Sequence, residues 1–72
     1  MVTRTQWVGV VKAYDDTGKP IINSFIDGRT IMGPWAIMTP ETHHAIGVGL
    51  GVGKGQLYRR HPVDDVWYKI NG

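Results

Sequence analysis

"PWAIMTPETHHAIG", residues 34–47, combines a short apolar run with the clearest helix start in the chain. The opening run PWAIM predicts a strand. Thr39 can cap a helix, and Pro40 suits the first helical position. Gly47 stands where a residue in the left-handed conformation commonly ends a helix, so we expect a helix of about residues 39–46. A strand that leads directly into a short helix indicates an α+β protein.

Upstream of this stretch, the sequence predicts a hairpin. TQWVGVVKAY (5–14) and IINSFID (21–27) are rich in β-branched and aromatic residues, which favour strands. The polar run DDTGKP (15–20) between them predicts the connecting turn. DGRT (27–30) is a second turn signal, so we expect the second strand to end there.

Downstream, QLYRR (56–60) and DVWYKI (65–70) predict a closing hairpin around HPVD. We expect Trp35 and Trp67 to anchor the core, because each lies in an apolar strand signal and a chain this short has little else to bury. The sequence therefore predicts a single domain over residues 1–72, small and α+β, with mostly antiparallel β hairpins and one short helix.

The composition limits how such a domain can be stabilised and what it can bind. The chain has 72 residues, no cysteine and a net charge of +2. Without cysteine, disulfides and thiolate-bound zinc are excluded, so we expect good aromatic packing, self-association as a twofold dimer, or both. The charge is well below that of a dedicated nucleic-acid binder. No apolar run approaches the roughly 18 residues of a membrane span, and residues 1–11 lack the features of a signal peptide, so we expect a soluble, intracellular protein without membrane contact.

The run GVGLGVGKG (47–55) invites comparison with phosphate-binding loops. It lacks the Ser or Thr that follows the lysine of a Walker A motif, and it lacks the third glycine of the dinucleotide-binding pattern. In an extended segment, Val48, Leu50 and Val52 would share one face and leave bare backbone on the other. We therefore expect a tightly packed internal connection rather than a phosphate site.

Residues 25–60 contain DGRT, GPWA and GVGLGVGKGQLY in this order. The stretch resembles a family of small uncharacterised bacteriophage proteins. The pattern of that family runs Asp-Gly-x-Thr, Gly-Pro-Trp-Ala, Met-Cys-x-x-Cys-His and Gly-x-Gly-Leu-Gly-x-Gly-x-Gly-Gln-x-Tyr, and an upstream Cys-x-x-Cys-Gly completes four thiolates. The resemblance implies a fold similar to a zinc ribbon or treble clef.

This chain departs from the family at the four cysteines. Tyr14, Thr17, Thr39 and Thr42 stand in their places, while the histidine after the second pair is present as His43. Neutral hydroxyls are poor zinc ligands, so we expect a metal-free version of the fold without a cofactor. Thr39 and Thr42 can still bond nearby backbone, and the Tyr14 ring could fill part of the vacated space.

Other residue types that could carry chemistry are few. His43, His44 and His61 could bind a metal together with Asp15 or Asp16, but neighbouring histidines on a helix point about 100° apart and cannot readily share an ion. The sequence contains no nucleophile elbow, no metal-hydrolase motif and no convincing acid–base pair. We therefore expect a protein that is not an enzyme.

The remaining hypotheses concern binding. The resemblance and the lack of catalytic residues suggest a small phage accessory protein that binds a host protein or defence complex in the host cytoplasm. A nucleic-acid-binding module and a minor virion component are the alternatives. The side chains that could reach outward around the helix and the closing hairpin are His43, His44, Lys54, Tyr58, Arg59 and Arg60. Equally, they could be an ordinary solvated face.

Overall fold

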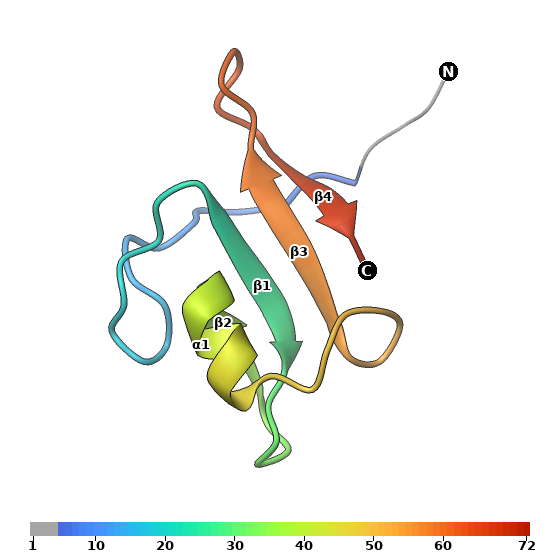
Figure 1. The fold of residues 1–72 in the computed structure, drawn as a ribbon. Helices are drawn as coiled ribbons and strands as arrows, with labels where there is room; N and C mark the ends of the chain where they lie inside the picture. Colours follow the sequence, from blue (N-terminus) through green and yellow to red (C-terminus); the bar gives the residue numbers. More distant parts are fainter. Residues whose placement is uncertain (1–4) are drawn as a thin grey trace.

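A computed structural model describes residues 5–72 as a four-stranded antiparallel sheet with one helix against it (Figure 1). The strands are β1 (Ser24–Arg29), β2 (Trp35–Met38), β3 (Gly55–Arg60) and β4 (Trp67–Asn71), and the helix is α1 (Pro40–Ile46). Their order across the sheet is β2-β1-β3-β4. The predicted α+β class is confirmed, as are the strand–helix unit in the middle of the chain and the closing hairpin.

The start of α1 follows the prediction, whereas its end does not. The Thr39 hydroxyl accepts a hydrogen bond from the backbone N–H of Thr42 at 3.3 Å, which caps the first turn. Gly47, predicted to be left-handed, has a φ of −79°. A glycine is favoured there for another reason: a Cβ at this position would collide with the ring of His43.

The predicted turn at residues 27–30 is wrong, because β1 continues through it to Arg29. Gly28 pairs with Ala36 on one side and with Gly55 on the other. A Cβ on Gly28 would lie 3.2 Å from the Cα of Gly55, so this glycine permits two strands to approach closely. The chain turns only after it, in residues 30–34.

The strand predicted over residues 5–14 is also wrong. This part of the chain makes only isolated bridges, Gln6 to Tyr68 and Tyr14 to Pro20, and Gly9 has a φ of 104° that interrupts an extended course. The segment crosses behind the sheet in the view of Figure 1. Residues 47–54 are likewise not the packed extended segment that was predicted, since Val52 is 96% exposed.

The N-terminal segment covers both edges of the sheet. At β4, the Trp7 N–H donates to the Trp67 carbonyl at 2.9 Å, and the Lys69 N–H donates to the Thr5 carbonyl at 2.8 Å. At β2, the Asp16 N–H donates to the Ile37 carbonyl at 2.9 Å, and the Ile37 N–H donates to the Asp16 carboxylate at 2.8 Å. Unpaired edges invite pairing with other chains, so this segment protects the sheet.

The core is small and centred on aromatic rings. Phe25 is fully buried, and its ring stacks on Tyr58 with 5.3 Å between centroids. Trp7 meets Phe25 edge-on at 5.1 Å, and Trp67 lies 5.3 Å from the same ring. Trp67 therefore contacts the core as predicted. Trp35 does not: it is 50% exposed, because it lies at the start of the edge strand β2, and Trp7 fills the core instead.

Candidate functional site

The turn at residues 15–20 and the start of α1 meet around a buried carboxylate. Asp15 accepts hydrogen bonds at one oxygen from the Thr17 N–H (2.9 Å), the Thr17 hydroxyl (2.7 Å) and the Lys19 N–H (3.0 Å). Its other oxygen accepts from the Thr39 N–H (2.9 Å) and the Thr39 hydroxyl (3.0 Å). The Thr42 hydroxyl lies 3.2 Å from that of Thr17 and 3.1 Å from that of Thr39. A hydrogen-bonded cluster thus joins the first turn of the chain to the start of α1.

The predicted role of Tyr14 in this region is wrong. Its ring is 60% exposed, whereas the next residue, Asp15, points inward and is buried. The bridge between Tyr14 and Pro20 fixes this orientation. Burial alone would raise the pKa of the Asp15 carboxyl, but hydrogen bonds, the largest from the Thr39 backbone and the Thr17 hydroxyl, hold that pKa well below its usual range.

This cluster is structural rather than a ligand site. The oxygen atoms of Asp15 are occupied by protein donors, and among the described residues every buried side-chain N or O atom has a hydrogen-bond partner. Within residues 5–72, no three His, Cys, Asp or Glu side chains gather in a way that could hold a metal ion. The same part of the chain contains no helix long and apolar enough to cross a membrane.

The residues predicted to form a binding surface do not come together. Tyr58 is buried in the core and cannot reach outward, which corrects the prediction for that residue. His43 is half-buried, with its Nε2 atom 3.0 Å from the Gly49 carbonyl oxygen. His44 and Lys54 are exposed near the glycine-rich loop, while Arg59 and Arg60 are exposed at the opposite end of β3.

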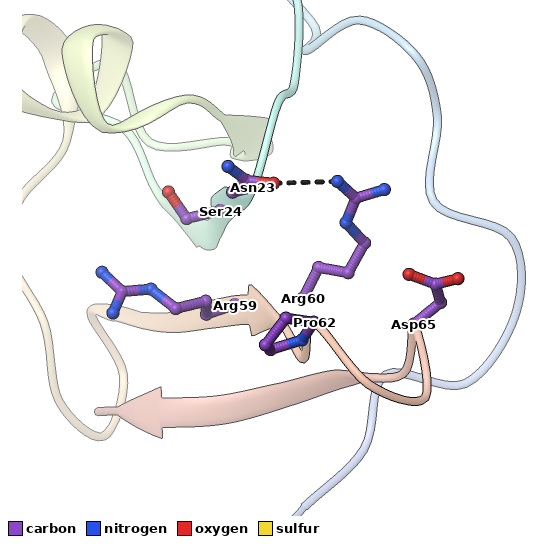
Figure 2. Close-up of a pocket in the computed structure, with 6 residues that line it drawn as sticks. All are labelled: Asn23, Ser24, Arg59, Arg60, Pro62 and Asp65. Carbon is purple, nitrogen blue, oxygen red and sulfur yellow. Dashed lines mark hydrogen bonds between the residues drawn. The ribbon is translucent and has the colours of Figure 1, made fainter.

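Arg59 and Arg60 line an open hollow of about 530 Å³ (Figure 2). Arg60 donates a hydrogen bond to the Asn23 side-chain oxygen at 2.9 Å. The Arg59 side chain extends away from that of Arg60, toward the side of Ser24 (Figure 2). Asp65 also lines the hollow, so a carboxylate faces any anion that the two arginines attract.

A second surface was not foreseen from the sequence. The turn between β1 and β2 carries the exposed side chains of Ile31 and Met32, and the exposed Trp35 follows at the start of β2; we call these three residues the apolar tip. Ile31 and Met32 are each 68% exposed. Val48, two residues beyond the end of α1, is also exposed, and its N–H donates to the Arg29 carbonyl at 3.1 Å beside the tip.

The apolar tip is held firmly by its own backbone. Thr30 donates to the Pro34 carbonyl from both its N–H (2.9 Å) and its hydroxyl (2.8 Å), and the Gly33 N–H donates to the Thr30 carbonyl at 2.9 Å. The Ile31 N–H donates to the Ile46 carbonyl at 2.8 Å, which ties the turn to the end of α1. The signal in the sequence was the pair Ile31-Met32 directly before Gly-Pro, since apolar side chains on a tight turn have no core to enter.

Comparisons of the chain with protein-family models, with curated proteins and with solved structures gave no match.

Proposed function

We propose that this protein is a non-catalytic binding module that engages another protein through the apolar tip. The observation that carries the proposal is the exposure of Trp35 at the start of β2, beside a turn that is fixed by hydrogen bonds. Exposed apolar groups that gather in one place mark interaction sites, and Trp is among the residues that dominate binding energy in interfaces.

The rigidity of the apolar tip supports the same proposal. Binding costs less when the contact residues are already ordered, because little conformational entropy remains to be lost. The small core makes the exposure of large side chains more informative: Ile31, Met32 and Trp35 lie outside a core that has few apolar residues to spare. The resemblance to bacteriophage proteins makes a protein of the bacterial host the expected partner.

Nucleic-acid binding is the second candidate, because Arg59 and Arg60 line one hollow. We rank it lower for two reasons. Asp65 lines the same hollow, and the two guanidinium groups point apart (Figure 2). Phosphate recognition is favoured where several cations converge, and the net charge of only +2 supplies few of them.

The test is affinity capture from a bacterial lysate with the parent protein, a Trp35→Ala variant and a Val63→Ala variant. Val63 is exposed on the loop between β3 and β4, so it is a matched control for removal of an exposed apolar side chain. We expect partner recovery to survive nuclease, to fall in Trp35→Ala and to persist in Val63→Ala. Equal recovery with Trp35→Ala would reject the apolar tip. Recovery that disappears with nuclease and with an Arg59→Ala, Arg60→Ala double variant would favour nucleic acid.

A further inference from the structure

The apolar tip has one cationic residue directly beside it and a second at the same end of the sheet. Arg29 on β1 lies opposite Trp35 on β2 as a cross-strand pair. Side chains in such pairs stand about 5 Å apart at their Cβ atoms. The Arg29 N–H donates to the Lys54 carbonyl at 2.7 Å, which brings a second cationic residue to the same end of the sheet. Among the described residues, neither Arg29 nor Lys54 makes an ion pair.

The carboxylates of the molecule are placed elsewhere. Asp16 and Glu41 lie toward the other end of β2 and α1, each in an ion pair with a lysine of the N-terminal segment. Asp64 and Asp65 lie in the loop beyond β3, at the far end of the sheet from the tip (Figure 1). The nearest acidic residue along β1 is Asp27, which is half-buried two pairs further into the sheet, opposite Ile37. The end that carries the tip therefore combines apolar side chains with unpaired positive charge.

We infer that the partner of the apolar tip is a protein that offers an apolar pocket rimmed by carboxylates. This inference rests on the proposed function and names the chemistry of the partner. The turn projects beyond the sheet (Figure 1), so its complement is concave. Trp35, Ile31 and Met32 would enter the pocket, and Arg29 and Lys54 would meet the acidic rim. Complementary charge at a rim speeds association and suppresses wrong partners.

A protein fits these observations better than a lipid surface or a nucleic acid. A lysine or arginine adds little by itself to binding at an anionic membrane, so two cations and three apolar side chains make a weak anchor. Nucleic acid gains affinity from phosphate contacts and from aromatic stacking, and Ile31 and Met32 supply neither. Pockets in proteins accept aliphatic and aromatic side chains alike, and Trp and Arg are typical dominant residues there.

The probe is a displayed library of random disulfide-closed cyclic peptides, which can wrap around a protruding turn. The library is selected on the parent protein and counter-selected on Trp35→Ala. We expect the enriched peptides to combine Asp or Glu with Leu, Ile or Phe, relative to the starting library. For an enriched peptide made by synthesis, Kd should rise at least about tenfold with Trp35→Ala and about three- to tenfold with Arg29→Gln or Lys54→Gln. The Kd for the parent protein should also rise with added salt. Arg59→Gln, which removes a cation at the far end of β3, should change Kd less than about twofold.

The outcomes separate the two proposals. If no enriched peptide depends on Trp35, the proposed function fails and the inference fails with it. If peptide binding depends on Trp35 but the peptides are not enriched in Asp or Glu, or if Kd is unchanged by Arg29→Gln and Lys54→Gln, the proposed function is supported and the inference about the partner is overturned. Binding that depends on Trp35 to vesicles of phosphatidylserine and phosphatidylcholine, or to a DNA duplex, would overturn it in favour of those ligands. A dimer in sedimentation that Trp35→Ala dissociates would assign the tip to a second copy of the chain instead.

Discussion

The carboxylate of Asp15 accepts five hydrogen bonds. Three come from Thr17 and Lys19 in the turn that follows it, and two come from Thr39 at the start of α1. The carboxylate thereby links two polar segments of the chain through hydrogen bonds, as a bound metal ion links two segments through its ligands in a zinc knuckle. A side chain with that role is difficult to replace, because several donors converge on its two oxygen atoms and the loss of a buried acceptor leaves donors unpaired.

We expect Asp15→Asn to lower the free energy of unfolding by roughly 2–4 kcal/mol, since an amide NH2 group would face buried donors in place of a charged oxygen. Urea denaturation followed by Trp fluorescence measures this change. Asp65→Asn is the matched control: Asp65 is exposed with a φ of 58°, a conformation that Asn adopts readily, so the change should stay within about 0.5 kcal/mol. An Asp15→Asn variant as stable as the parent would contradict the structural role of the cluster.

The same carboxylate predicts a loss of stability in acid. Because the pKa of Asp15 is lower in the folded state than in the unfolded chain, the unfolded state takes up the proton first as the pH falls below about 4. The stabilisation is thus fully present near neutral pH and is lost on acidification. Between about pH 6 and pH 3, the parent should lose more unfolding free energy than Asp15→Asn. Asp64, with a lowered pKa, and Asp27, with a raised one, are present in both proteins and cancel in this comparison. Equal losses would contradict the prediction.

At the scale of elements, the contact between β1 and β3 depends on a glycine pair. Gly28 and Gly55 lie opposite each other, and a Cβ on Gly55 would lie 2.9 Å from the Gly49 carbonyl oxygen. The same Cβ would lie 3.3 Å from the Gly28 Cα. Because both of these neighbours are backbone atoms, β1 or the glycine-rich loop of residues 47–54 would have to shift. We expect Gly55→Ala to lower the free energy of unfolding by roughly 1–3 kcal/mol. Val52→Ala, in the exposed part of the same loop, should change the free energy of unfolding by less than about 0.5 kcal/mol. Equal melting temperatures for the two variants would refute the steric account.

The elements that were predicted correctly are those whose signals are local. The cap of α1 needs only Thr39 and the residues just after it, and β2 follows from the run PWAIM. The end of β1 was misplaced because the turn residues of DGRT are overridden by pairing with β3, which lies far along the sequence. The segment 5–14 has strand composition but leaves the sheet after one bridge, since Gly9 turns the chain and no neighbouring strand accompanies it.

At the scale of the molecule, sequence reasoning could not decide which tryptophan enters the core. Trp35 lies in the more apolar stretch, but β2 is an edge strand and its first residue lies next to a turn. Trp7 lies in a segment without regular structure, yet its ring meets Phe25 and Tyr58 at 5.1 and 5.3 Å. For the same reason the predicted binding surface is wrong at Tyr58: Trp7, which lies far from it in the sequence, packs against its ring in the core.

We therefore expect the two tryptophans to differ in their effect on stability. Trp7→Ala should lower the free energy of unfolding by roughly 2–4 kcal/mol, somewhat below the cost for a fully buried ring because Trp7 is half-buried. Trp35→Ala should cost less than about 1 kcal/mol. Urea denaturation of both variants side by side measures the difference, and a larger loss for Trp35→Ala would restore the original assignment of the core.

The pairing of residues 5–7 with β4 also has a consequence for the order in which the molecule folds. It joins segments from opposite ends of the described chain, so its closure carries a large entropic cost and should follow the formation of the β1–β3 pair. Contacts that form after the transition state govern the rate of unfolding and not that of refolding. In stopped-flow experiments, Trp7→Ala should therefore unfold faster than the parent and refold at nearly the same rate, which would make docking of the N-terminal segment the final step of folding and its release the first step of unfolding.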